Sequence, residues 1–224
     1  MSSLGKAYNN YLETLISIFT IEKADIKVLL FRKKTEPYKG YWILPGSIIK
    51  NDETLEDNIT DAVLDKTGLL NVYIEQCYTF SNLDRAPEAR IIATSFIGLV
   101  DSKSVEIKRE ERPEYETAWF SINELPKLGY DHESVLARNI EYLKKRLINV
   151  NTLKSLFPSD FTLPELQSVY EQIYGREIDR RNFRKKIEVL GLIEDTLEKN
   201  TGGHGRPAKL YRFKEDIKDI NLYL

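Results

Sequence analysis

The order of the predicted elements indicates an α+β protein built in two parts. Strand-like runs of β-branched and aromatic residues occupy 14–21, 25–34, 72–81 and 89–100. One amphipathic helical pattern at 54–68 interrupts these strands, and a second, at 131–148, follows them. Mixed strands with one inserted helix and one closing helix predict a layered α+β sandwich. The last third of the chain then changes to two short helices and a hairpin.

Composition is that of a soluble globular protein. The 224 residues are enough for two small domains or one large one. Hydrophobic residues make up 42% and charged residues 30%, with a formal net charge of -2. The single cysteine, Cys77, cannot form an intrachain disulfide, which favours a reducing compartment such as the cytoplasm. We see no signal-peptide core and no apolar run long enough to span a bilayer.

The first part begins with a predicted hairpin in which the segment EKAD joins the runs 14–21 and 25–34. A loop then leads through YWILPGS to the first helix, with Thr54 as its N-cap and Gly68 as its end. One face of this helix carries Leu55, Ile59, Ala62, Val63 and Lys66.

The rest of the first part contains three more strands and the closing helix. The segment NLDRAPE turns the chain between the strands 72–81 and 89–100, and residues 108–116 form a charged loop. A strand is expected within 117–126, and the helix 131–148 follows, with Asp131 as its N-cap. The closing helix places the boundary within 148–160, and we assign the domains to 1–150 and 151–224.

The second part has the pattern of a winged helix-turn-helix. Thr162 and Glu165 form a predicted capping box, Pro164 lies in the first turn, and Gly175 ends this helix. Asp179 caps a second helix that ends at Gly191; its apolar stripe is Phe183, Ile187 and Leu190. The strands LIEDT and KLYRF flank the loop LEKNTGGHGRPA. Helix, turn, basic helix and hairpin are the parts of a winged helix.

The distribution of charge agrees with this interpretation. Residues 176–212 contain ten Lys or Arg and six Asp or Glu, a local charge of +4 in a chain of net charge -2. Basic residues on one helix and one hairpin are typical of a phosphate-binding surface, although a charge run is also typical of a solvated helix face. The glycine-rich wing can present Arg206, with His204 beside it, to a groove or a phosphate.

Two strings in this region, NFRKK and GRPAKLYRF, resemble the C-terminal domain of Nudix-related transcriptional regulators of the NrtR type. The resemblance implies a Nudix-like α/β/α sandwich at 1–150 that senses a ligand and a winged helix at 151–224 that binds double-stranded DNA. The usual effector of such proteins is ADP-ribose or a related NAD metabolite, and the regulated genes are those of NAD metabolism. Some relatives sense sugars instead.

Residues 46–69 resemble a degenerate Nudix box, the loop and helix that bind metal in hydrolases of nucleoside diphosphates. Gly46 is followed by six residues, one more than the pattern allows, before Glu53. The three metal-binding carboxylates of the pattern become Ala62, Asp65 and Lys66. Hydrolysis of a diphosphate needs divalent cations held by several oxygen ligands. We therefore expect little or no hydrolase activity, no required cofactor and no Mg²⁺ site.

The same resemblance suggests the residues of the effector site. Arginine can bind a diphosphate bidentately, and an aromatic ring can stack on a base. Trp42 and Phe80 can equally be core residues, Asp131 can be a helix cap, and Asp84 with Arg85 can brace a turn. The expected ligand contacts are Arg32, Trp42, Phe80, Asp84, Arg85, Arg90, Asp131 and His132.

DNA binding is assigned to the basic face of the second winged-helix helix and to the wing. The expected contacts are Arg180, Arg181, Arg184, Lys185, His204 and Arg206. A single winged helix gives a small footprint, so we expect a homodimer on a palindromic operator. Two other classes stay open: a Nudix hydrolase whose second domain only dimerises, and a protein-interaction module.

Overall fold

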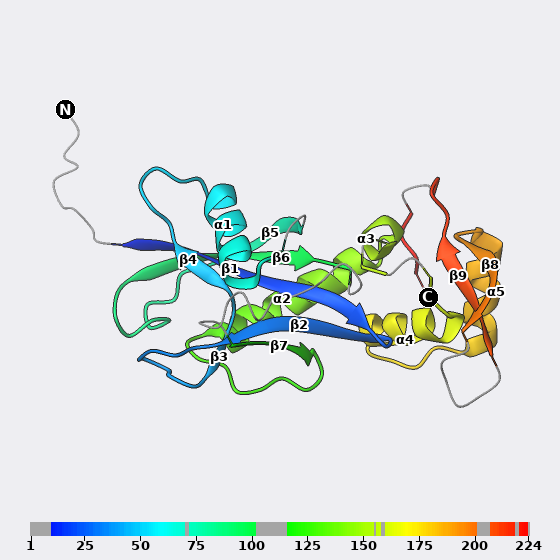
Figure 1. Cartoon of the computed structure of the whole chain (residues 1–224), viewed down its shortest axis with the longest axis horizontal. Coiled ribbons are helices and arrows are strands. Elements are labelled where there is room, and N and C mark those ends of the chain that lie inside the picture. Colours follow the sequence, from blue (N-terminus) through cyan, green and yellow to red (C-terminus); the bar gives the residue numbers. More distant parts are fainter. Residues whose placement is uncertain are drawn as a thin grey trace.

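A computed structural model describes the chain at residues 10–69, 72–101, 116–154, 156–157, 160–200, 207–217 and 220–223. Within these ranges a larger part contains a mixed sheet with helices, and a smaller part contains two helices and a hairpin, joined end to end (Figure 1). The predicted elements occur in the predicted order, and two short strands at 42–43 and 46–48 and a short helix at 150–154 are added to them. Of the expected charged loop, residues 108–115 lie outside the described ranges.

The larger part is centred on β1 (Tyr11–Glu22), which pairs antiparallel with β2 (Asp25–Arg32) and parallel with β6 (Ile91–Leu99). The strand order is β3-β2-β1-β6-β5, with β4 added to β1 and β7 added to β2. A central strand covered on both faces is buried on both, and β1 is buried without interruption from Thr14 to Ile21, which explains why 14–21 shows no alternation. The remaining strands are β3 (Trp42–Ile43), β4 (Gly46–Ile48), β5 (Tyr73–Phe80) and β7 (Glu116–Ser121).

Helices cover both faces of this sheet, which confirms the α/β/α sandwich. Side chains of a strand point alternately to opposite faces. Ile16 of β1 packs in the cluster that contains α1 (Leu55–Thr67), whereas Leu15 packs in the cluster that contains α2 (His132–Leu147). The predicted Thr54 cap is present, and Asp57 completes a capping box with it.

Asn139 of α2 ties this helix to the sheet through a fully buried amide. Its Nδ2 donates to Ser17 Oγ at 3.0 Å and to the Phe96 carbonyl at 3.2 Å. Its Oδ1 accepts from Ser95 Oγ at 2.8 Å. A buried amide of this kind fixes how α2 lies over β1 and β6, because any other position leaves polar groups without partners.

A short helix, α3 (Val150–Lys154), lies at the junction of the two parts. The last described residues return to it: Val150 N–H donates to the Ile220 carbonyl at 3.0 Å, and Leu222 N–H donates to the Ile148 carbonyl at 2.8 Å. The expected domain boundary at 150–151 falls on this junction and stays a prediction.

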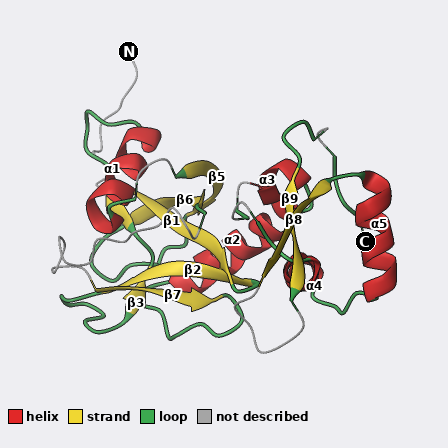
Figure 2. Cartoon of the chain, turned by 45° about the vertical axis from the view of Figure 1, so that its right-hand side comes forward, coloured by secondary structure: helices red, strands yellow, loops and turns green. Residues whose placement is uncertain are grey.

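The smaller part contains α4 (Leu163–Tyr174), α5 (Arg180–Leu190) and a hairpin of β8 (Ile193–Asn200) with β9 (Ala208–Phe213) (Figure 2). The Thr162 capping box is present, and Gly175 and Gly191 end the two helices with φ of 65° and 61°. These local predictions are confirmed. The described helices are all too short or too polar to cross a membrane.

Two details of the smaller part differ from expectation. Phe183 and Ile187 are buried, but Leu190, the last residue of α5 before the Gly191 cap, is 40% exposed. The first strand of the hairpin runs on to Asn200, with a register shift between Asp195 and Lys199. The bulge lets a sequence of low strand propensity continue pairing.

Replacing Asn139 with Ala should destabilise the chain by about 3 kcal/mol, because the hydroxyls of Ser17 and Ser95 lose their buried partner. Urea unfolding followed by circular dichroism measures the effect. The matched control is Asn123→Ala in an exposed turn, which should change the free energy of unfolding by less than about 0.5 kcal/mol. Equal effects of the two changes would contradict the role given to Asn139.

Candidate ligand cleft and nucleic-acid interface

A cleft of about 700 Å³ opens in the larger part, where β1 begins and β2 ends. Its walls come from β1, β2, β4, α1, the loop after β5 and the start of α2. Both apolar and charged side chains face it. The lining residues used below are Glu13, Phe31, Arg32, Gly46, Lys66, Arg85, Tyr130 and His132.

Arg85 is the central charge of the cleft. Its side chain is 2% exposed. Nη1 donates to Glu13 Oε2 at 3.0 Å, while Nε and Nη2 donate to the two carboxylate oxygens of Asp131 at 3.1 and 3.0 Å. A bidentate arginine–carboxylate pair is among the stronger polar contacts in proteins. One guanidinium therefore joins the start of β1 to the start of α2.

The sequence places Asp131 at the N-cap of α2, and it does occupy that position, but its side chain makes no capping hydrogen bond. The expected N-cap position is therefore confirmed, whereas the side-chain cap hydrogen bond is absent. The carboxylate instead turns to Arg85, because a charge-assisted pair with a buried guanidinium outweighs one hydrogen bond to an exposed helix end. Burial raises the pKa of the neighbouring Glu13, and the bond from Arg85 opposes part of this change.

His132 is buried beside this group. Its Nδ1 accepts a hydrogen bond from Leu44 N–H at 3.0 Å. Burial, with a smaller repulsion from Arg85, lowers the pKa of His132 to about 3, so the ring is neutral at neutral pH. His132 thus holds the segment that leads into β4 and presents an uncharged ring to the cleft.

The Nudix-box positions do not fit a divalent cation. Ala62 is buried and offers no oxygen, and Asp65 is exposed. The Lys66 ammonium donates to the Gly46 carbonyl oxygen. This oxygen, which could otherwise bind a metal ion, is therefore already bonded to the ammonium. Within the described residues no group of three or more His, Cys, Asp or Glu could hold a metal ion.

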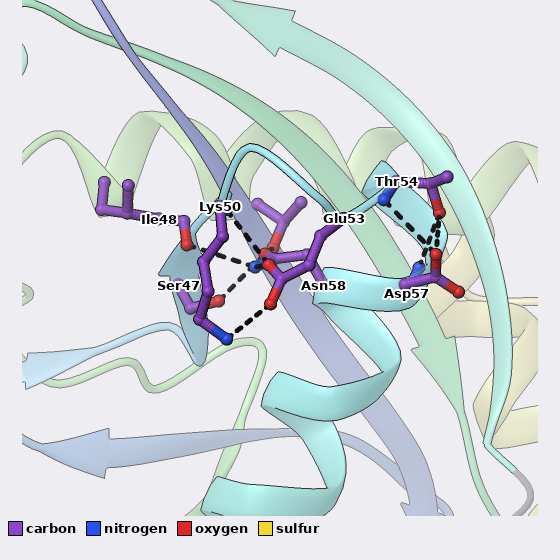
Figure 3. A network of polar contacts seen from close by, with 8 residues as sticks. Ser47, Ile48, Lys50, Glu53, Thr54, Asp57 and Asn58 are labelled. Atoms are coloured by element: carbon purple, nitrogen blue, oxygen red, sulfur yellow. Dashed lines mark hydrogen bonds and ion pairs between the residues drawn. The ribbon is translucent and has the colours of Figure 1, made fainter.

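Glu53, the remaining acid of the box, forms hydrogen bonds with Lys50 of the same loop and with Asn58 of α1 (Figure 3). Its carboxylate accepts from Lys50 Nζ at 2.6 Å, Asn58 Nδ2 at 2.8 Å and the Lys50 backbone N–H at 3.1 Å. Hydrogen bonding from Lys50, then from Asn58, lowers the pKa of Glu53 to about 2.

Asn58 completes this network on the buried side of the loop: its Oδ1 accepts from Thr14 Oγ1 and Ser47 Oγ at 2.5 and 2.9 Å. Asn58 is not among the residues expected from the sequence, where its signal is a polar side chain on the buried face of a helix.

The other expected ligand residues fall into two groups. Arg32 lines the cleft, and its guanidinium contacts the Gly40 carbonyl at 3.0 Å and Glu116 at 3.4 Å. Trp42, Phe80, Asp84 and Arg90 do not belong to the lining. Their contribution to ligand binding stays a prediction.

Local structure explains their positions. Trp42 precedes the cleft-lining Ile43 in β3, so its ring faces the other side of the sheet. There the centre of its ring lies 4.8 Å from that of Phe120. Phe80 packs on Tyr78 at 5.1 Å, and Arg90 donates to the carbonyls of residues 81 and 82. Asp84 is exposed.

Tyr130 is an aromatic residue of the cleft that the sequence analysis does not select. Its ring lies 4.6 Å from that of Tyr38 and 5.4 Å from that of His132. Its hydroxyl donates to Glu88 at 3.2 Å, and burial, with the nearby Glu88, raises its pKa to about 12. Its backbone has a positive φ of 57°, an uncommon value for a residue other than glycine.

The second candidate surface is α5. Phe183 and Ile187 bury one face of this helix, and the Phe183 ring packs on Tyr170 of α4 at 5.9 Å. The opposite faces carry the expected basic residues, all exposed: Arg180, Arg181, Arg184 and Lys185. Arg184 also pairs with Glu188 at 2.8 Å, one turn later. The exposed basic helix is what backbone contact with a nucleic acid needs.

Two basic residues of the β8–β9 hairpin, unlike most of those on α5, form ion pairs within the protein. Lys209 pairs with Asp195 at 2.6 Å, and Arg212 pairs with Asp160 at 3.1 Å. These pairs brace the wing and its attachment. The expected contacts His204 and Arg206 lie outside the described residues.

Comparisons with known proteins agree with both parts. Residues 154–213 match a family model described as the NrtR DNA-binding winged helix domain. Over 213 residues the chain is 30% identical to a protein of Acinetobacter baylyi named ADPR responsive transcriptional repressor NtrR, covering 92% of this chain and 83% of the relative. It is also 32% identical over 131 residues to an ADP-ribose pyrophosphatase of Methanocaldococcus jannaschii, covering 58% and 76% of the two chains.

A solved structure extends the likeness to the arrangement of the parts. The crystal structure of Shewanella oneidensis NrtR complexed with a 27mer DNA superimposes with a TM-score of 0.72 at 30% identity. The match covers 91% of this chain and 93% of that one. The sandwich followed by a winged helix is therefore confirmed as the fold of this chain.

Replacing Arg85 with Met should destabilise the chain by about 3 kcal/mol, because two largely buried carboxylates lose their cation. Thermal and urea unfolding measure the change. The matched control is Arg138→Met, which breaks an exposed pair with Glu141 and should cost less than about 1 kcal/mol. If both variants unfold alike, Arg85 is not the structural tie described above.

Proposed function

Because the chain belongs to the NrtR family, we propose that it is an ADP-ribose-responsive transcriptional repressor of NAD-metabolism genes. The winged helix binds operator DNA, and occupation of the cleft by ADP-ribose releases it. Support comes first from the extent of the similarity, which spans both parts of a relative named as an ADPR responsive repressor. The exposed basic face of α5 is the second support, because a hydrolase does not need such a helix to cleave its substrate, whereas a DNA-binding protein needs it to contact phosphates.

DNA contact is assigned to the exposed face of α5, which enters the major groove, and to the wing with His204 and Arg206. Two chains bind together as a homodimer on a palindromic operator, so that two copies of α5 reach successive half-sites. The exposure of Arg181 and Lys185, with the apolar face of α5 turned to α4, supports this orientation.

The effector is assigned to the cleft beside Arg85. Arg32 and Arg85 supply guanidinium groups for the diphosphate, and Tyr130 offers a ring on which adenine or ribose can pack. A diphosphate that draws Arg85 toward itself competes with Glu13 and Asp131 for the same N–H groups. Ligand binding therefore acts on the tie between β1 and α2.

Both of these elements reach the smaller part. The turn between β1 and β2 lies against α4: Gln172 Nε2 donates to the Ala24 carbonyl at 2.6 Å, and Ile26 N–H donates to Gln172 Oε1 at 3.1 Å (Figure 1). The far end of α2 packs on α4 as well. A change at Arg85 thus has two rigid routes to the winged helix, and it alters the spacing of the two DNA-binding helices in a dimer.

Hydrolysis of the effector is not part of this function. The contact between Lys66 and Gly46 and the absence of a carboxylate at Ala62 support binding without efficient cleavage. The pyrophosphatase relative makes the hydrolase the second candidate. A regulator of the same architecture that senses a pentose is the third.

The first test is fluorescence anisotropy of DNA from the protein's own upstream region, titrated with the chain in the presence and absence of ADP-ribose. We expect specific binding that ADP-ribose weakens about fivefold to a hundredfold. Ribose, AMP and NAD serve as comparison ligands. Recovery of intact ADP-ribose after incubation with Mg²⁺ should accompany the effect; its cleavage would favour the hydrolase.

Variants of α5 locate the DNA-binding surface in the same assay. Arg181→Ala with Lys185→Ala should weaken binding and reduce the slope of log affinity against log salt by about 1 for each phosphate that the variant no longer neutralises. Lys186→Ala is the control, because this ammonium bonds the Tyr223 carbonyl. An unchanged salt slope in the double variant would move DNA binding away from α5.

Gln172→Ala tests whether the β1–β2 hairpin transmits the effect of ADP-ribose to the winged helix. ADP-ribose should still bind, measured by calorimetry, while its effect on DNA affinity falls several-fold, because two of the three side-chain hydrogen bonds between the β1–β2 hairpin and α4 are lost and the bond from Ser168 Oγ to the Ala24 carbonyl is left. Gln167→Ala is the control on the same helix, since within the described residues its amide bonds to Glu171 and the Ile178 carbonyl and not to the β1–β2 hairpin. A Gln172 variant that responds to ADP-ribose as fully as the control would remove Gln172 from this route, and the same result with Ser168→Ala added would exclude the route.

A further inference from the structure

Lys66 places a positive charge where the Nudix pattern has a metal-binding carboxylate. Its side chain lines the cleft. Its Nζ bonds the Gly46 carbonyl oxygen and lies 5.4 Å from the centre of the Phe31 ring. A carbonyl oxygen and an aromatic face are both partners of a cation. The ammonium is therefore held in place by two elements other than its own helix.

Gly46 is placed for this contact by the pairing of β4 with β1. Gly46 lies opposite Leu15, and a Cβ at position 46 would come within 2.2 Å of the Thr14 carbonyl oxygen. Only glycine permits this close approach of the two backbones. The carbonyl that receives Lys66 is thus fixed by the sheet and does not depend on a movable loop.

The surroundings suit an anion. Lys66 and Arg85 line the same cleft, and Glu13 is the acidic group near both. Burial lowers the pKa of Lys66, opposed by Asp65 and Glu13, so the ammonium is less well solvated here than in water. A diphosphate in the cleft would supply the missing counter-charge and would favour the protonated amine.

We propose that the Lys66 ammonium is a built-in cation that binds the diphosphate of the effector, so that this cleft takes a nucleoside diphosphate sugar without a divalent metal ion. The proposal rests on the proposed function for the identity of the ligand. A lysine has three N–H donors, of which the Gly46 carbonyl takes one. The others can reach phosphate oxygens where a metal would otherwise bridge them.

A tethered ammonium also explains the rest of the degenerate box. A divalent cation needs several oxygen ligands, and it would be repelled by a lysine at the centre of its site. A metal that lowers the pKa of a water molecule creates the nucleophile for hydrolysis, whereas an ammonium does not. Binding is kept and cleavage is lost by the same substitution.

The test is calorimetric titration of the full chain with ADP-ribose and, separately, with inorganic pyrophosphate, each in EDTA and in millimolar Mg²⁺. The wild-type affinity should be the same in both conditions. Lys66→Met should lose about tenfold to a hundredfold in affinity for either ligand, the effect of one hydrogen bond to a charged group. Lys66→Glu should bind weakly in EDTA and recover in Mg²⁺. Lys50→Met, an exposed lysine of the same loop, is the control for charge alone.

Several outcomes overturn the proposal. A wild-type affinity that falls tenfold in EDTA would show that a metal is needed, and this result requires no variant to fold. Full affinity in a folded Lys66→Met chain would leave ADP-ribose as effector but remove Lys66 from its site. Pyrophosphate binding that depends on Lys66, with no binding of ADP-ribose, would keep the ammonium site and refute the effector. Binding of neither ligand would refute both.

Discussion

The three-way contact of Arg85 with Glu13 and Asp131 is the constraint on which the larger part depends. One guanidinium, almost fully buried, holds the first residues of β1 and α2 at 3.0–3.1 Å from its nitrogens. Both elements begin at the ligand cleft and end against the winged helix. A buried cation is stable only while its partners stay in place. In the proposed function, a ligand that competes for Arg85 therefore changes how β1 and α2 are held relative to each other, and both elements contact the winged helix.

In the proposed function, the Nudix-like loop binds a ligand without a metal ion while the fold is kept. Glu53 does not face an open metal position; together with Asn58 it closes the loop onto β1 and β4. Lys66 satisfies the Gly46 carbonyl from the other side. Polar groups that are fully bonded within the protein rigidify their surroundings. These contacts hold the shape of the loop and helix, and in our proposal the Lys66 ammonium takes the place of a metal ion.

Local signals account for most of what the sequence predicted correctly. The capping box of Thr162 and Glu165, the glycine caps at Gly175 and Gly191 and the basic face of α5 depend on residues within one or two helical turns. The Arg85 contacts could not be found in this way, because its partners lie 72 and 46 residues away in the chain. Local reasoning assigned a capping role to Asp131 instead. Nor could it tell which face of a two-residue strand would take the Trp42 ring, since that depends on Phe120 of another strand.

The cleft and the DNA surface are, in the proposed function, two ends of one coupled system, and coupling of binding equilibria is reciprocal. The most direct measurement is the affinity of ADP-ribose for the chain alone and for the chain saturated with its operator DNA, by calorimetry at one salt concentration. ADP-ribose should bind the DNA complex more weakly, by the same factor by which it weakens DNA binding. Equal affinities in the two states would contradict the coupling, even if both ligands bind tightly on their own.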